Sequence, residues 1–155
     1  MCACCPTAAT PDFGCVWEGY CSDFGRTVHI GEPSAEFRRA YQTVIAVHDA
    51  AIREMRTGQI TAAGANAVAR KVVDDAGFRA HFRHRLGHGI GLDVHESPFL
   101  TKADSTPLQT GMAFTVEPSI YWVGQIGTRI EDVVIVRPEG GEVLNESHTD
   151  LRVVG

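Results

Sequence analysis

The sequence has no surplus of positive charge, no long hydrophobic run and no cysteine beyond residue 21. Nineteen acidic residues against fourteen basic ones give a net charge of −5, and no stripe of Lys and Arg suited to a phosphate backbone is present. We therefore expect no nucleic acid partner. No apolar run approaches the roughly eighteen residues of a membrane-spanning helix. The start, "MCACCPTAAT", has neither the basic nor the apolar region of a secretory signal. We accordingly expect no membrane partner and a cytoplasmic protein.

The cysteines are gathered at one end of the chain, at positions 2, 4, 5, 15 and 21. An odd number without a signal peptide argues against a disulfide framework. Cys2 and Cys5 form a lone C-x-x-C, but a structural zinc site needs a second well-spaced pair, which Cys15 and Cys21 do not supply. We interpret the cysteines as reduced thiols without a metal.

The pattern of hydrophobic residues predicts one α+β domain with a mostly antiparallel sheet. At 155 residues, 44% of them hydrophobic, the chain is long enough to bury about two-thirds of its unfolded surface. The predicted elements are a hairpin over 12–30 turning at Glu18-Gly19, helices over 33–56 and 61–76, strands over 86–95, 112–123 and 126–136, and a short strand near Val143. Strands followed by two helices and then by more strands are typical of the α+β class.

Carboxylates occur inside strands that are otherwise apolar. Glu117 in "FTVEPSI" and Glu131 in "TRIEDVVIV" are flanked by β-branched residues, and a buried carboxylate is costly unless it is paired, protonated or bound to metal. Asp12 and Asp23 are expected on neighbouring strands of the same hairpin. Because side chains alternate along a strand, Arg129 shares a face with Glu131. Four carboxylates around one arginine would repel one another, so the pattern predicts one or two divalent cations.

One histidine fits this predicted metal site. In "GHGIG" the glycines around His88 remove side-chain bulk and allow a close approach of the backbone. One imidazole with four carboxylates suits manganese, iron or cobalt better than structural zinc. Two ions about 3.5–4 Å apart can share a bridging hydroxide, which is a nucleophile at neutral pH. Taken singly, His88 could be a core histidine and Glu131 an ion-pair partner of Arg129, but five such groups on one sheet favour metal.

Four ordered motifs, "DFG…YCSDFGRT", "GHGIGLDVHESP", "GMAFTVEPSIY" and "GTRIEDVVIV", resemble the signatures of the pita-bread metallopeptidases (family M24), in the branch of aminopeptidase P and prolidase. The resemblance implies a pita-bread fold, with a curved, mostly antiparallel sheet and helices on its outer face. It runs from residue 12 almost to the C-terminus, so residues 12–155 resemble the C-terminal part of the catalytic domain. Residues 1–11 are expected to be a short unrelated leader on a chain truncated at its N-terminus. We expect no strand there, because Pro11 cannot donate to a ladder and no apolar alternation precedes it.

The same resemblance implies a role for each candidate residue. It makes five residues the ligands of two divalent metal ions, usually manganese or cobalt: Asp12, Asp23, His88, Glu117 and Glu131. His95 resembles a catalytic histidine that contacts the scissile peptide group, and His84 a second histidine lining the substrate pocket. Arg129 resembles an arginine that supports the metal-binding carboxylates.

The implied activity is hydrolysis of Xaa-Pro peptide bonds by a water that bridges the two metals. Methionine aminopeptidases of this fold carry glutamine where "RIED" supplies Arg129, which favours the proline-directed branch and peptide substrates with proline at the second position. Two alternatives stay open. One is a truncated, weakly active or non-catalytic remnant, which would self-associate as a homo-oligomer through an exposed apolar face. The other is a creatinase-like amidinohydrolase without metal, against which the retention of Asp12, Asp23 and Glu131 argues.

Overall fold

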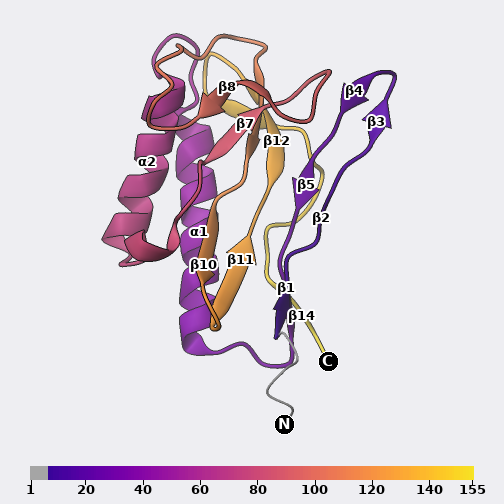
Figure 1. Cartoon of the computed structure of the whole chain (residues 1–155), viewed down its shortest axis with the longest axis vertical. Coiled ribbons are helices and arrows are strands. Elements are labelled where there is room, and N and C mark those ends of the chain that lie inside the picture. The colour runs from indigo at the N-terminus through magenta and orange to yellow at the C-terminus, as the bar shows by residue number, and fades with distance from the viewer. Residues whose placement is uncertain (1–6) are drawn as a thin grey trace.

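A computed structural model describes residues 7–155 of the chain. In Figure 1 two helices lie against one side of a set of strands, and a two-stranded arm extends at the end opposite β1 and β14. The strands before the helices are short: β1 (Ala8–Ala9), β2 (Asp12–Phe13), β3 (Val16–Trp17), β4 (Tyr20–Cys21), β5 (Phe24–Gly25) and β6 (Val28–Ile30). The helical part comprises α1 (Ala35–Glu54), α2 (Ala62–Asp75) and the 3-10 turn η1 (Arg79–His81). The remaining strands are β7 (Gly87–Gly89), β8 (Glu96–Leu100), β9 (Ala113–Val116), β10 (Ser119–Trp122), β11 (Ile126–Arg129), β12 (Asp132–Val136), β13 (Gly141–Val143) and β14 (Arg152–Val154).

The hairpin predicted at the start of the chain is present. Its strands pair in two stretches, β2 with β5 and β3 with β4, and it turns at Glu18 (φ 49°) and Gly19 (φ 89°). Left-handed backbone at both central positions is what a tight hairpin turn requires, and glycine adopts it without strain. Asp12 lies opposite Gly25 in this register. The two aspartates of the hairpin are therefore offset by two residues on one face.

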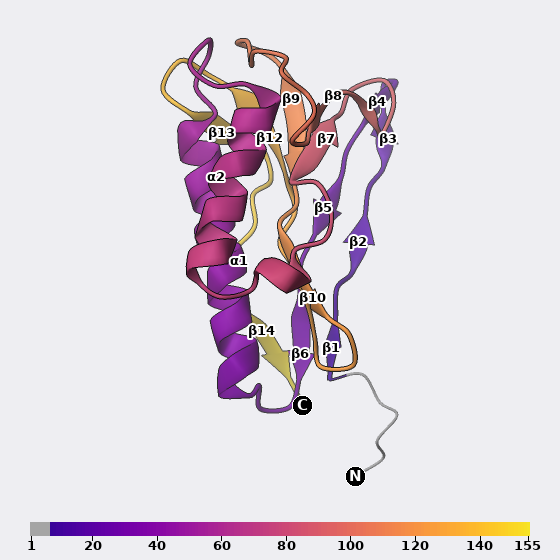
Figure 2. The ribbon, with the colours of Figure 1, turned by 60° about the vertical axis from the view of Figure 1, so that its left-hand side comes forward.

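Both helices form where the sequence predicts them, because each has a side-chain cap and an apolar stripe. The hydroxyl of Ser34 accepts a hydrogen bond from the Phe37 amide at the start of α1, and Thr61 caps α2 through the Gly64 amide. The two helices pack against each other (Figure 2) and bury one face of α1 against the sheet. Tyr41 is 1% exposed there. Its hydroxyl donates to the carbonyl of Thr149 at 2.8 Å, which ties the C-terminal segment to α1.

The largest sheet runs in the order β13-β12-β9-β7-β8. Every strand pair between residues 7 and 155 is antiparallel except β14 with β6. The predicted class, α+β with a mostly antiparallel sheet, is therefore confirmed.

Four details of the predicted strands are wrong. The predicted strand over 86–95 stops at Gly89, after which the chain makes bends before β8 begins at Glu96. The predicted strand over 112–123 is broken at Glu117 and Pro118, because proline has no amide to donate to a ladder. The strand over 126–136 is likewise broken, at Ile130 and Glu131. Lastly, Ala8 and Ala9 form β1 against β6 although no strand was expected before Asp12, because the partner strand supplies the hydrogen bonds.

Candidate metal centre

The breaks in the strands lie where the predicted site residues are. Glu117 sits between β9 and β10, and Glu131 between β11 and β12. The Glu131 amide donates to the carbonyl of Gly25 at 2.9 Å, and the Gly25 amide donates back at 3.1 Å. This reciprocal pair fixes the hairpin that carries Asp12 and Asp23 against the strand break that carries Glu131.

His88 is held in the middle of β7 by close backbone packing. Its amide donates to the hydroxyl of Thr115 on β9 at 3.1 Å. A Cβ at the preceding residue, Gly87, would lie 1.9 Å from the Thr115 carbonyl oxygen, which is far too close for any side chain. The glycine is therefore needed for β7 to approach β9 and bring the imidazole of His88 into the site.

All eight candidate residues predicted from the sequence line one cavity of about 620 Å³. They are Asp12, Asp23, His84, His88, His95, Glu117, Arg129 and Glu131. Arg85, Val94 and Thr101 also line it and were not predicted. For Arg85 the sequence offered a signal, a cation within the "HRLGHG" motif; nothing in the sequence pointed to the other two.

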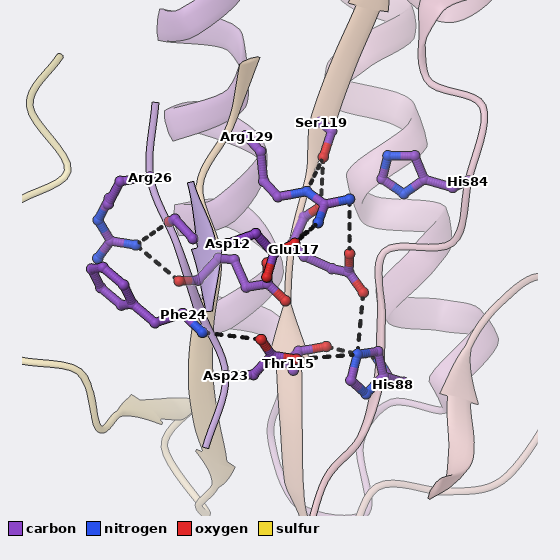
Figure 3. Close-up of polar contacts among 12 residues, drawn as sticks. Asp12, Asp23, Phe24, Arg26, His84, His88, Thr115, Glu117, Ser119 and Arg129 are labelled. Carbon is purple, nitrogen blue, oxygen red and sulfur yellow. Dashed lines mark hydrogen bonds and ion pairs between the residues drawn. The ribbon is translucent and has the colours of Figure 1, made fainter. Parts of the chain in front are cut away.

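The ring of His88 is oriented so that one nitrogen faces carboxylates (Figure 3). Its Nδ1 lies 3.0 Å from the Gly89 carbonyl oxygen, which can only accept, so Nδ1 carries the proton. Burial lowers the pKa of His88 to about 4, so the ring is neutral near pH 7 and Nε2 bears a lone pair. Nε2 lies 3.5 Å from Glu117 Oε1 and 3.8 Å from Asp23 Oδ2. The imidazole nitrogen and the carboxylate oxygens thus face the same small space, an arrangement in which a bound cation can accept all of their lone pairs.

Burial disfavours the charged form of three carboxylates in the site. Burial, with the neighbouring charges of Glu117 and Asp23, raises the pKa of Glu131 to about 8. Burial also raises the pKa of Glu117, and burial together with Asp12 raises that of Asp23. Ligand atoms of Asp23, His88 and Glu131 all lie within 4.8 Å of one another. The donor set therefore fits a divalent cation.

Arg129 is the cation that the site itself provides. Its guanidinium lies 2.6 Å from Asp12 Oδ2, 3.3 Å from Glu117 Oε2 and 3.4 Å from Glu131 Oε2. Its Nε donates to the hydroxyl of Ser119 at 2.9 Å, and Figure 3 shows the side chain stretched across the carboxylates. A single guanidinium serves all three carboxylates, so Arg129 orients them without supplying a counter-charge for each.

The other two histidines occupy different positions in the cavity. His95 is exposed, on the bend before β8, with its ring centroid 4.2 Å from that of His88. His84 lies beside Tyr121, its Nδ1 2.8 Å from the Arg85 carbonyl oxygen. Burial lowers the pKa of His84, and its Nε2 is buried without a hydrogen-bond partner.

A buried ion pair next to Glu131, which the sequence analysis missed, holds the backbone of the candidate site in place. Arg26 donates to both carboxylate oxygens of Asp132, at 2.8 and 3.1 Å, and to the carbonyl of Glu131 at 2.9 Å. His48 Nε2 on α1 lies 3.0 Å from the same carboxylate. The network ties the hairpin, β12 and α1 together next to Glu131. The sequence feature that could have revealed this network is Asp132, the second acidic residue of "RIED".

Comparison with known proteins places the chain in a family. Residues 9–138 match metallopeptidase family M24, and the chain belongs to that family. It is 41% identical over 143 residues to the Xaa-Pro dipeptidase of Lactobacillus delbrueckii subsp. lactis, covering 92% of this chain and 39% of the relative.

Two solved structures are similar to the fold. The X-Pro aminopeptidase from Thermotoga maritima matches at a TM-score of 0.90 and 38% identity, over 95% of this chain and 41% of that one. Dipeptidase PepE from Mycobacterium ulcerans matches at a TM-score of 0.91 and 43% identity, and the match covers 95% of this chain and 40% of that one. The expected pita-bread fold is thus confirmed. The chain spans about two fifths of the length of these relatives.

Two other expectations meet the structure only in part. Cys15 and Cys21 are free thiols, whereas Cys2, Cys4 and Cys5 lie outside the described residues. In the described part of the chain, no helix is both long and apolar enough for a membrane span.

Proposed function

We propose that this chain forms the centre of a metal-dependent peptidase that hydrolyses Xaa-Pro peptide bonds with two divalent ions. The observation that carries the proposal is the lone pair of His88 Nε2, which faces the carboxylates of Asp23 and Glu117 at 3.8 and 3.5 Å. The names of the relatives, Xaa-Pro dipeptidase and X-Pro aminopeptidase, support proline-directed cleavage.

The proposed ligands are Asp12, Asp23, His88, Glu117 and Glu131. Carboxylate oxygens with one imidazole suit manganese, and cobalt as the alternative, better than a thiolate-preferring metal. When bound, two such ions lower the pKa of a bridging water and polarise the scissile carbonyl.

Four residues of the cavity have further roles in this proposal. Arg129 holds three of the carboxylates in place through its guanidinium. His95 lies at an exposed position beside His88 and would donate a hydrogen bond to the oxygen that gains negative charge during cleavage. His84 lines the same cavity and would contact the peptide backbone. Glu117, on the cavity wall, would take the proton of the attacking water.

Hydrolysis assays on the purified chain test the proposal. An Xaa-Pro dipeptide and an Xaa-Pro-Xaa tripeptide are incubated with manganese or with chelator, beside matched peptides that carry alanine in place of proline. We expect manganese-dependent cleavage of the proline peptides only, and the peptide length that is preferred separates dipeptidase from aminopeptidase activity. Bound metal without turnover would favour a weakly active or non-catalytic chain. Creatine hydrolysis that survives chelation would favour the amidinohydrolase alternative.

Location and assembly remain proposals as well. The free thiols of Cys15 and Cys21 support a reducing, cytoplasmic environment. Exposed apolar side chains on the hairpin arm, Phe13, Val16, Trp17 and Tyr20, support self-association.

A further inference from the structure

A second cavity, of about 510 Å³, adjoins the metal centre and is lined mainly by cations. Its lining residues are Asn66, Arg70, Arg79, Arg83, His84, Arg85, Thr101 and Lys102. Five of these eight are basic and none is acidic. Because the whole chain carries a net charge of −5, this concentration of positive charge is local and creates an attractive potential for anions. We call it the cationic cavity.

Within the described part of the chain, most of these cations have no charged partner of their own. Arg70 donates to the carbonyls of Phe82 and His84 at 3.4 and 3.2 Å, and Arg83 to that of Ala80 at 3.3 Å. Carbonyl groups fix the side chains but leave their charges in place. Arg79 alone is near a carboxylate, Asp74, at 3.4 Å, and its side chain is 83% exposed.

Arg85 is the cation of this cavity whose hydrogen-bonding capacity is least satisfied. Among residues 7–155 it forms no ion pair, and its Nε is buried without a hydrogen-bond partner. Its guanidinium lies over the ring of Phe99, 5.1 Å from the centroid. A buried donor left unpaired costs free energy, and an anionic ligand in the cavity would supply the counter-charge that the Arg85 guanidinium lacks among residues 7–155.

The cationic cavity adjoins the proposed catalytic cavity. His84, Arg85 and Thr101 line both cavities. A peptide bound over the metal ligands therefore has a neighbouring space in which to place a further group. Guanidinium groups recognise a carboxylate through paired hydrogen bonds.

We propose that the cationic cavity binds a carboxylate of the substrate peptide outside the scissile bond, on Xaa itself or on the residue after proline. The inference rests on the proposed peptidase function for the placement of the peptide, and it adds acidic peptides as the preferred substrate class.

Calorimetric binding in chelator, where metal-dependent cleavage cannot occur, tests this directly. Two pairs of C-terminally amidated peptides are compared: Glu-Pro-Ala with Gln-Pro-Ala, and Ala-Pro-Glu with Ala-Pro-Gln. We expect one acidic peptide to bind about tenfold or more tightly than its amide partner, and the pair that discriminates identifies the position of the carboxylate. The double variant Arg79→Gln/Arg83→Gln should lose the preference. A matched variant of two exposed arginines on α1, Arg38→Gln/Arg53→Gln, should keep it.

Equal affinities within both pairs, including no binding at all, would overturn the inference. A preference for the acidic peptide that survives in the Arg79→Gln/Arg83→Gln variant would also overturn it. Binding of inorganic phosphate without any preference for the acidic peptides would overturn it as well. Preferential binding of acidic peptides that are not cleaved when manganese is added would leave this inference standing and remove the peptidase function.

Discussion

Nη2 of Arg26 donates to both carboxylate oxygens of Asp132, at 2.8 and 3.1 Å, next to the proposed metal centre. The Asp132 side chain is 1% exposed and that of Arg26 12%. The pair joins the hairpin that carries two candidate ligands to the strand that follows Glu131, so the geometry of the centre depends on it.

Removing one charge of this pair should destabilise the fold. Asp132→Asn leaves Arg26 buried without its counter-charge, and such a change costs about 3–5 kcal/mol. Urea unfolding of the purified chain measures the loss. The control is Asp75→Asn, which breaks an exposed pair with Lys71 whose contribution is at most about 1 kcal/mol. Equal effects of the two substitutions would contradict the structural role of Asp132.

Substitution of His88 and of His95 should have different effects on metal binding and on activity. His88→Ala removes a candidate ligand, so manganese affinity and activity should be lost together. His95→Ala should retain manganese and lower kcat by about 10²–10³, the usual cost of a lost oxyanion donor. Manganese titration beside a peptide assay separates the two outcomes. The reverse pattern, with metal lost from His95→Ala and kept by His88→Ala, would reverse the assignment.

A methyl group at Gly87 should disturb the centre through the backbone. In Gly87→Ala the new Cβ would meet the Thr115 carbonyl at 1.9 Å, so β7 must move away from β9 and take His88 with it. We expect a loss of about 1–3 kcal/mol in unfolding free energy and weaker manganese binding. Gly127→Ala is the matched control, because its Cβ would lie 3.7 Å from the nearest atom, an ordinary contact with Tyr121. A Gly87 variant that behaves like the Gly127 variant would show that this close approach is not required.

The metal-free chain should lose stability as pH rises from 6.5 to 8. Glu131 has a folded pKa of about 8 against an ordinary 4.5, so the folded chain binds more protons across that interval and rising pH favours unfolding. His88 and His84, whose pKa values burial lowers from 6.5, act in the opposite direction, and their effect fades above about pH 7 as the unfolded imidazoles lose their protons. Denaturant midpoints measured in chelator at pH 6.5, 7.2 and 8.0 should fall in this order. Glu131→Gln should flatten the trend, and an unchanged slope in that variant would assign it to other groups.

The sequence predicted the helices, and the side chains that gather around one cavity, better than it predicted the strands. Helix α2 was found because Thr61 caps it and apolar residues recur at helical spacing, which are local properties. Strand β14 was missed because all three of its residues are exposed and it shows no alternation, so its pairing with β6 depends on the tertiary fold. Glu117 and Glu131 were found because a carboxylate inside an apolar strand is conspicuous. Arg85 was not singled out although it lies within the "HRLGHG" motif, because its two neighbouring cavities become evident only in the folded chain.

Manganese binding measured by equilibrium dialysis tests the central claim most directly. We expect two ions per wild-type chain at saturation, and weaker binding with fewer ions in Glu131→Gln, because this substitution removes a ligand from the cluster that includes Asp23 and His88. No bound manganese in the wild type, or the same binding in wild type and variant, would contradict the metal centre described above.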